Sequence, residues 1–351
     1  MTASPPTAKA DSKPPPKSLG RGLLLIAVIL ALPLFAAMMA IFVPGPAVVE
    51  KIAIVPHGTH VNGIGIPLKE SDAVYSTVLF RLAARLLAND ALKAGEYQIA
   101  PHASMASIII MMHDGRSVVR MFTVAEGLTS IEIAHLLEDN PVLSGEVPPP
   151  PPEGSLLPES YRYIYGDSRA SIIARMQKAM QETLAGEWAH RDPGLSLKSP
   201  QEALVMASLI EKETAKKEER SRIARVFYNR LAHNMRLQSD PTVIYALNKG
   251  DGPLNRTLDR RDLAVNSPYN TYINDGLPPG PICNPGRASI EAALHPEPND
   301  FLYFVADGNG GHVFTTNLNE HNRNVAKWDK IKAQAETTAA APAPAAKPAA
   351  P

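Results

Sequence analysis

The sequence predicts an α+β protein with a single N-terminal transmembrane helix, a small α+β module and a larger α+β domain. Three observations support this prediction: an unbroken apolar run near the N-terminus, a region where strand-like and helix-like patterns alternate, and a long segment with strong helical signals. The chain has 351 residues, which is enough for two modest domains with additional terminal segments.

The charge balance and the cysteine count exclude several classes of protein. The 35 basic side chains balance the 35 acidic ones, whereas bulk electrostatic binding of nucleic acid requires a surplus of Lys and Arg. We therefore expect no nucleic-acid partner. The single cysteine, Cys283, excludes an intramolecular disulfide and a thiolate metal cage.

An apolar run of 21 residues, from Leu23 to Val43, predicts the transmembrane helix. A helix of ~20 residues crosses the ~30 Å hydrocarbon core of a bilayer. A cleaved signal peptide is the alternative, but its apolar core would run about 7–15 residues and end at a small-residue cleavage site. This run is longer, and no convincing site of that kind precedes Pro44. We therefore expect a retained anchor over residues 21–43.

The flank of this run predicts its orientation. The preceding residues are mainly basic, with Lys9, Lys13, Lys17 and Arg21 against Asp11 alone. Basic flanks stay on the cytoplasmic side of the membrane. We therefore expect a single-pass protein of the cell inner (plasma) membrane. Residues 1–20 would be a disordered cytoplasmic segment, and everything after residue 44 would lie on the periplasmic side.

Alternating patterns over residues 47–118 predict the small α+β module. The expected elements are a strand over 48–55, a helix over 73–87, a turn and short strand over 93–99, and a helix over 106–112. A strand over 118–124 and a helix over 130–137 then open the larger domain, which we expect to span residues 119–330.

Two proline-rich stretches mark linkers rather than core. Residues 148–152 are five consecutive prolines, which form a stiff exposed bridge. An amphipathic helix is expected after it, over 170–184. Residues 331–351 are expected to be a disordered tail, since most of this stretch is Ala and Pro and cannot pack a core.

Residues 199–233 carry the clearest helical signal and the best candidate for a general acid. Ser199 and Glu202 form a capping-box pattern with Pro200 at the first helical position. Residues 204–210 are apolar on nearly every side, so this turn should be buried. A carboxyl group at the end of such a segment tends to hold its proton, provided that no cation offsets the burial. Glu211 occupies that position.

Other interpretations of the acidic residues stay open on the helix alone. Glu211 can equally be a surface residue beside Lys212, and the burial argument does not exclude Glu213 as the acid. Glu218 and Glu219 follow two turns later, and ion pairing with neighbouring Arg or Lys side chains accounts for Glu218 in particular.

The histidines near the C-terminus do not predict a metal site. The spacing of His312, Glu320 and His321 matches no helical zinc-binding pattern. We therefore expect neither a metal nor a cofactor.

Several blocks along the chain resemble one known family. The blocks are 206–215 (MASLIEKETA), 219–220 (ER), 226–231 (VFYNRL), 235–245 (MRLQSDPTVIY), 267–272 (SPYNTY), 276–282 (GLPPGPI), 284–286 (NPG), 303–306 (YFVA) and 320–322 (EHN). Together they resemble the signature of the endolytic murein transglycosylases, the MltG or YceG-like family. The resemblance covers roughly residues 48–330, and a single N-terminal anchor agrees with the layout of that family.

The resemblance implies a LysM-like module over 47–118 and a YceG-like catalytic domain over 119–330. It implies that Glu211, the first Glu of the E-K-E-T block, is the catalytic residue. Glu211 would protonate the glycosidic oxygen between MurNAc and GlcNAc in peptidoglycan. The carboxylate would then accept the proton of the C6 hydroxyl of the same MurNAc, which closes onto C1 and leaves a 1,6-anhydro end. Intramolecular attack suits such a site because the nucleophile is already tethered near the reacting carbon.

Polar side chains of the blocks are expected to bind the glycan, because sugar recognition uses amides, hydroxyls and aromatic faces. The predicted substrate-binding residues are Asn229, Gln238, Asp240, Tyr269 and Asn270. For each of them a structural contact within a loop is the alternative, and Asp240 can also serve to orient Glu211.

The predicted function is therefore that of a membrane-anchored lytic transglycosylase that cuts nascent glycan strands internally. The expected partners are peptidoglycan glycan strands, the inner membrane and the synthases of elongation or division, with the enzyme ending strand growth. Two alternatives stay open. One is a scaffold that binds glycan without cutting it. The other is a hydrolytic muramidase, which needs a second carboxylate, with Glu219 or Asp240 the nearest in sequence.

Overall fold

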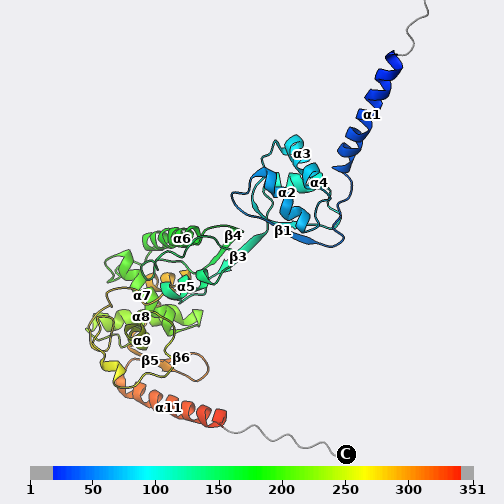
Figure 1. Cartoon of the computed structure of the whole chain (residues 1–351). Helices are drawn as coiled ribbons and strands as arrows, with labels where there is room; N and C mark the ends of the chain where they lie inside the picture. The colour runs from blue at the N-terminus through cyan, green and yellow to red at the C-terminus, as the bar shows by residue number, and fades with distance from the viewer. Residues whose placement is uncertain (1–18, 341–351) are drawn as a thin grey trace, which may run out of the picture. The chain divides into compact units, whose positions relative to one another are not determined.

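The computed structural model describes residues 19–340 (Figure 1). The predicted cytoplasmic segment therefore lies almost wholly outside the described residues, as does the end of the predicted C-terminal tail. The chain divides into two compact units, with the boundary between Val118 and Val119. Each unit mixes helices with a small amount of sheet, so the predicted α+β class is confirmed.

The first unit contains four helices and one antiparallel pair of strands within the described residues. Its elements are α1 (Leu19–Ala40), β1 (Lys51–Val55), α2 (Val61–Glu70), α3 (Thr77–Ala88), β2 (Gly95–Ile99) and α4 (Met105–Asp114). β1 and β2 are antiparallel, with Lys51 opposite Ile99 and Val55 opposite Gly95. In the described part of the chain, no helix is both long enough and apolar enough to cross a membrane.

The core of the first unit forms where α2, α3 and α4 cover the two strands. Phe80, Tyr97 and Ile109 are fully buried in it. The expected strands and helices of this region are found, apart from shifts of a few residues at their ends. α2 was not predicted, because Gly63, Gly65 and Pro67 obscure its helical pattern. The LysM-like character of the unit stays a prediction.

The second unit contains the sequence blocks that carry the family resemblance, and it is mainly helical. It begins with β3 (Val119–Thr123), α5 (Ser130–Glu138), β4 (Ser160–Ile164) and α6 (Arg169–Ala189). It continues with α7 (Pro200–Glu213), α8 (Lys217–Ala232), α9 (Asp240–Asn248), the 3₁₀ turn η1 (Asp262–Ala264) and α10 (Arg287–Leu294). It ends with β5 (Tyr303–Ala306), β6 (His312–Thr315) and α11 (Leu318–Ala340).

The strands of the second unit pair two by two. β3 is antiparallel to β4, and β5 is antiparallel to β6. The predicted disordered tail is partly helical, since α11 continues to Ala340. The reason is the alanine content of this stretch, because Ala has the highest intrinsic helix propensity. The proline run 148–152 has no regular secondary structure and is exposed or half-buried, as expected.

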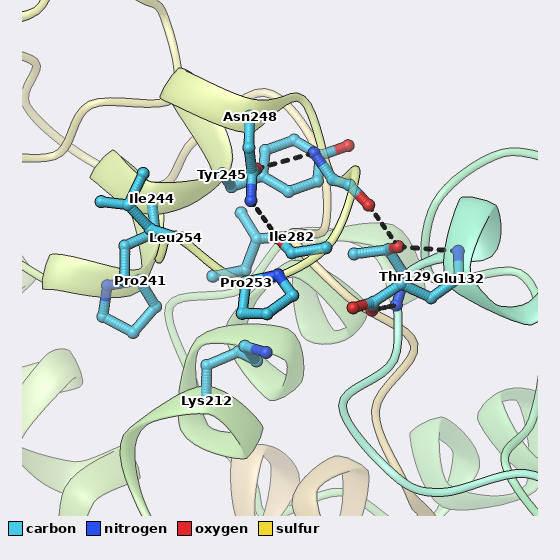
Figure 2. Close-up of a pocket in the computed structure, with 12 residues that line it drawn as sticks. Thr129, Glu132, Lys212, Pro241, Ile244, Tyr245, Asn248, Pro253, Leu254 and Ile282 are labelled. Atoms are coloured by element: carbon cyan, nitrogen blue, oxygen red, sulfur yellow. Dashed lines mark hydrogen bonds between the residues drawn. The ribbon is translucent and has the colours of Figure 1, made fainter. Parts of the chain in front are cut away.

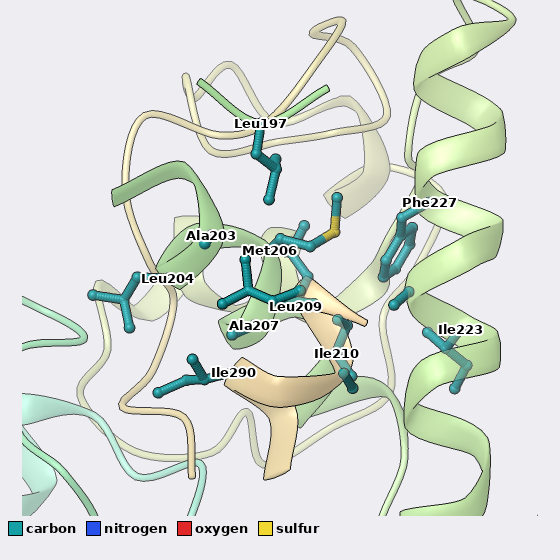
Figure 3. Packing of buried hydrophobic residues seen from close by; sticks show 14 of the residues in the cluster. Leu197, Ala203, Leu204, Met206, Ala207, Leu209, Ile210, Ile223, Phe227 and Ile290 are labelled. Atoms are coloured by element: carbon teal, nitrogen blue, oxygen red, sulfur yellow. The ribbon is translucent and has the colours of Figure 1, made fainter. Parts of the chain in front are cut away.

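α7 is the centre of the largest core and explains where Glu211 lies. Its residues 203–210 are all buried, and they pack against α6, α8 and α10 (Figure 3). Met206, Leu209 and Phe227 are among the side chains that interlock there. The single helical signal over 199–233 is therefore two helices, which are separated by the short connection between Glu213 and Lys217.

The N-terminus of α7 forms only half of the predicted capping box. The Ser199 hydroxyl accepts a hydrogen bond from the Glu202 backbone N–H at 3.2 Å. The Glu202 carboxylate instead accepts from the N–H of Lys198, at 2.6 Å, one residue before the cap. This arrangement still fixes the start of α7 and, through the rigid helix, the height of Glu211 at its other end.

Candidate active site

Glu211 lies in the last turn of α7, where the buried segment of the helix ends. Its side chain is only 5% exposed. Oε1 accepts a hydrogen bond from Arg220 Nη2 at 3.0 Å, and Oε2 accepts one from the backbone N–H of Gly286 at 2.9 Å. Both carboxylate oxygens therefore have a fixed partner, and the group has one defined orientation.

The burial argument made from the sequence required that no cation lie beside Glu211, and this condition is not met. The Arg220 side chain is itself only 5% exposed, and it lies in the first turns of α8. A charge-assisted hydrogen bond of this kind is among the stronger ones in proteins. The condition attached to the burial argument therefore fails, although the side chain of Glu211 is buried as that argument assumed.

Glu126 is a second carboxylate at this site, and the sequence did not predict it. Glu126 Oε2 accepts from the same Arg220 Nη2, at 3.1 Å. Since one nitrogen contacts both carboxylates, the oxygens of Glu126 and Glu211 lie no more than about 6 Å apart, a range over which paired carboxylates act in glycosidases. The Glu126 side chain is 41% exposed, so it faces solvent more than Glu211 does.

Gly286, the N-cap of α10, makes room for this arrangement. Its backbone φ of −74° is open to any residue. However, a Cβ atom at this position would lie 1.9 Å from Glu126 Oε1. The absence of a side chain therefore lets the Gly286 N–H reach Glu211 while Glu126 occupies the adjacent space.

Glu126, Glu211 and Arg220 line a cavity of about 550 Å³, which we call the Glu211 cavity. Its remaining lining comes from the loop before α5, from α5 itself, and from the end of α7 with its connection to α8. The lining residues are Glu126, Gly127, Leu128, Glu132, Glu211, Lys212, Glu213, Thr214, Ala215 and Arg220. A cavity with a buried carboxyl group, a second carboxylate and a fixed cation is suited to acid–base chemistry on a polar substrate.

Glu213 belongs to a neighbouring hollow of about 490 Å³, which also includes two of the predicted substrate-binding residues, Gln238 and Asp240. Burial raises the pKa of Glu213 to about 7. The negative charge of Asp240 also raises this pKa, whereas the hydrogen bond that Ser239 Oγ donates at 2.5 Å lowers it. Asp240 accepts a hydrogen bond from the Tyr272 hydroxyl at 2.5 Å. Gln238 is exposed, with a left-handed φ of 51°.

Tyr269 lies apart from these residues, half-buried against the ring of Tyr245 at a centroid distance of 4.9 Å. Tyr245 in turn lines a third, smaller cavity. Of the predicted substrate-binding residues, Gln238 and Asp240 therefore line the same hollow. Tyr269 instead packs against Tyr245, which lines a different cavity.

For Asn229 and Asn270 the geometry favours the structural alternative over substrate binding. Asn270 is 0% exposed, and its amide donates to the carbonyls of Leu263 and Val265 at 3.1 and 2.9 Å. The amide of Asn229 donates to the carbonyls of Asn299 and Phe301 at 2.9 and 3.0 Å. Both amides are occupied in holding loops, which was the structural alternative for each.

Glu219 is likewise occupied by structural contacts. Its carboxylate accepts from the backbone N–H of His312 at 3.0 Å and contacts the His312 ring at 2.7 Å, and Thr214 donates to it at 3.2 Å. Burial alone would raise the pKa of Glu219, but the bonds from His312 and Thr214 outweigh it and lower the pKa. Within residues 19–340, no group of three or more His, Cys, Asp or Glu side chains is arranged to hold a metal ion.

Sequence reasoning thus missed Glu126, Arg220 and Gly286. The sequence places Arg220 in a block of the family resemblance and offers it as an ion-pair partner for Glu218 or Glu219, but it does not indicate that Arg220 reaches Glu211. Glu126 stands far from Glu211 in the sequence, in the loop between β3 and α5. The one available signal was the Glu126-Gly127 pair directly after a strand, where a polar residue is often placed at a site.

Comparison with known proteins agrees with the resemblance seen in the sequence blocks. The sequence model of the YceG-like family matches residues 53–327. The endolytic murein transglycosylase of Bacillus subtilis (strain 168) is 36% identical over 313 residues, which cover 79% of this chain and 84% of that protein. That of Streptococcus pneumoniae (strain D39) is 31% identical over 318 residues, covering 78% of this chain and 57% of that protein.

A solved structure of a YceG-like protein from Listeria monocytogenes is 34% identical and covers 78% of this chain and 98% of that chain, with a TM-score of 0.48. The family match extends over most of the chain and includes every residue of the Glu211 cavity. The predicted family resemblance is confirmed, and the chain belongs to the YceG-like family.

Proposed function

We propose that this protein is an endolytic lytic transglycosylase that cleaves the bond between MurNAc and GlcNAc in nascent peptidoglycan. The observation that carries the proposal is Glu211, a buried carboxyl group held by Arg220 and Gly286 on the wall of a cavity of about 550 Å³. The names of its relatives, which are endolytic murein transglycosylases, support the same activity.

In this proposal Glu211 acts first as an acid and then as a base. Its proton passes to the glycosidic oxygen as the bond to C1 of MurNAc breaks. The resulting carboxylate accepts the proton of the C6 hydroxyl of the same sugar, whose oxygen bonds to C1. The products are a free hydroxyl on one strand and a 1,6-anhydro end on the other, and no water is consumed. The Gly286 N–H and Arg220 hold the carboxylate between the two steps.

The test uses the full chain in detergent on polymeric, uncrosslinked glycan, with products read by mass spectrometry. The wild type is compared with Glu211→Gln, which keeps the shape and loses the acid. Anhydro-ended fragments from the wild type and none from the variant support the proposal. Glycan that sediments with the protein and is never cut would instead favour a binding scaffold.

Hydrolysis is the second candidate, and Glu126 is the observation that favours it. A muramidase needs a second carboxylate to activate water or to act as a nucleophile. Glu126 is a better candidate than Glu219 or Asp240, because it shares Arg220 with Glu211 and lines the same cavity. Reducing ends in the assay above, lost on Glu126→Gln, would establish this reaction.

We also propose that the chain is anchored in the cell inner membrane by residues 21–43, with its N-terminus in the cytoplasm and the residues after 44 on the outer side. The apolar run from Leu23 to Val43 and its basic flank support this. The exposed apolar side chains of α1 agree with it, among them Leu24, Leu32 and Phe35 at 60% or more. The test is carbonate extraction of membranes that contain the full chain or a chain without residues 1–46.

An anchored enzyme of this kind would act on glycan close to where it is polymerised. We propose that it ends the growth of glycan strands beside the synthases of elongation or division. Depletion of the protein in cells should then lengthen the strands, which chromatography of amidase-treated glycan measures.

A further inference from the structure

A cavity of about 270 Å³ lies beside the Glu211 cavity and plays no part in the proposed reaction; we call it the side cavity (Figure 2). One side is apolar and consists of Pro241 and Ile244 of α9 together with Leu254 from the following loop. The opposite side includes Glu132 of α5, and Lys212 of α7 lies between the two (Figure 2).

The two cavities adjoin each other. Glu132 and Lys212 line both, and Lys212 directly follows Glu211 in α7. A group attached to a sugar in the Glu211 cavity therefore needs to extend past only these two side chains to enter the side cavity.

The walls of the side cavity are held in place before any ligand arrives. The Thr129 hydroxyl donates to the carbonyl of Gly250 at 2.5 Å, which joins the loop after α9 to the start of α5. The side chain of Asn248 accepts from the Gly250 N–H at 2.9 Å within that loop. Ligand-binding cavities are commonly pre-formed in this way, with apolar walls and a few fixed polar groups.

The charges at its edge are not neutralised by the protein. Within residues 19–340 neither Lys212 nor Glu132 makes an ion pair. Lys212 Nζ donates to the Gly127 carbonyl at 3.3 Å, and one Glu132 oxygen accepts from the Thr129 N–H at 2.8 Å. The cavity therefore offers a cation, an anion and an apolar wall in close proximity.

We propose that the side cavity binds the peptide stem carried by the MurNAc whose bond is cut. The stem is a short chain of alanine residues, a glutamate and a diamino acid, so it presents methyl groups, carboxylates and an amine. Lys212 suits its carboxylate, Glu132 its amine, and the apolar wall its methyl groups. A further sugar ring fits less well, because its hydroxyls would lie unpaired against Ile244 and Leu254. This inference rests on the proposed function.

The experiment compares two substrates that differ only in the stem. Uncrosslinked strands that bear peptides are prepared, and one half is treated with an amidase that removes them. Initial rates of end formation give kcat/KM for the full chain in detergent on each. The variants are Leu254→Ala and Ile244→Ala, and the control is Leu318→Ala, a comparably apolar side chain that is 52% exposed on α11.

The wild type should prefer peptide-bearing strands, and each wall variant should lower kcat/KM on them by about tenfold, the usual effect of removing apolar contact from a pocket. Rates on bare strands should stay the same in every variant, and the control should match the wild type on both substrates. Equal losses on both substrates would overturn the inference and assign the side cavity to a sugar. So would an unchanged rate on peptide-bearing strands. If the wild type cuts neither substrate, the proposed function itself fails.

Discussion

Glu211 and Glu126 are joined through one atom, since Arg220 Nη2 lies 3.0 Å from an oxygen of the first and 3.1 Å from an oxygen of the second. The guanidinium is buried, and its Nε and Nη1 have no protein partner among the described residues. All of its pairing is thus concentrated in this one nitrogen and the two carboxylates.

Replacement of Arg220 should be costly to the fold. In Arg220→Met the Glu211 carboxylate keeps its buried position and loses its cation, and breaking a buried pair from one side costs about 3–5 kcal/mol. Urea unfolding measures the loss, and activity should fall with it. The matched control is Lys178→Ala, which removes an exposed pair with Glu182 and should cost less than about 0.5 kcal/mol. Similar unfolding curves for the two variants would contradict the importance of the Arg220 bridge.

Gly286→Ala should displace Glu126 and spare the backbone. The added Cβ would lie 1.9 Å from Glu126 Oε1, and this flexible side chain can swing away. Since Glu126 shares Arg220 with Glu211, its displacement should shift Arg220 against the Glu211 carboxylate. We expect a loss of activity of roughly 10- to 100-fold, as for small displacements in active sites, with little change in melting temperature. Gly186→Ala on α6 has free space around it and should behave as the wild type.

A double variant makes this prediction sharper. When Glu126 is already alanine, no carboxylate remains for the new methyl group to meet. Gly286→Ala should then have no further effect on the rate. An additional loss in the double variant would mean that the glycine acts through something other than Glu126.

Glu213 should make the stability of the protein depend on pH. Its pKa rises from 4.5 to about 7 on folding, mainly through burial. Between these pH values the folded state binds more protons than the unfolded state, so stability falls as the pH rises through this window. Relative to Glu213→Gln, the wild type should lose on the order of 2–3 kcal/mol from pH 4 to pH 8. Glu218→Gln, at an exposed position, should show no such dependence.

Alanine variants of Asn270 and Gln238 should distinguish a structural residue from a substrate-binding one by their effects on stability and KM. Asn270→Ala leaves two part-buried carbonyls and the Tyr272 N–H without their partner, at a cost of about 1–3 kcal/mol. At low temperature its KM should equal that of the wild type. Gln238→Ala should raise KM without a comparable loss of stability, because Gln238 is exposed and lines the hollow of about 490 Å³ that also includes Glu213. A raised KM in Asn270→Ala would restore it as a substrate-binding residue.

The sequence predicts those parts of the molecule that depend on neighbouring residues. The apolar residues 203–210 predict the buried helix α7, and with it the position of Glu211. Gly115 ends α4 two residues after the predicted helix end at 112, in the left-handed conformation that glycine adopts readily. Local patterns of this kind are sufficient to predict these helices, because each pattern depends only on residues within a few helical turns of one another.

The remaining features depend on contacts between distant segments. Nothing near Glu126 in the sequence indicates that Arg220 will reach it from α8. The close approach of Gly286 is decided by the path of the loop before α10. The same reason left the alternatives for Asn229 and Asn270 open, since a polar side chain in a loop looks alike in sequence whether it faces a ligand or another backbone.

The groups around Glu211 come from three stretches of the chain: the loop before α5, the first turns of α8 and the start of α10. None of these stretches assembles the site alone, so the site is complete only when α8 and α10 both pack against α7. Correct packing of distant segments is therefore a condition for activity, and a chain that kept its helices without this packing would lack the arranged site.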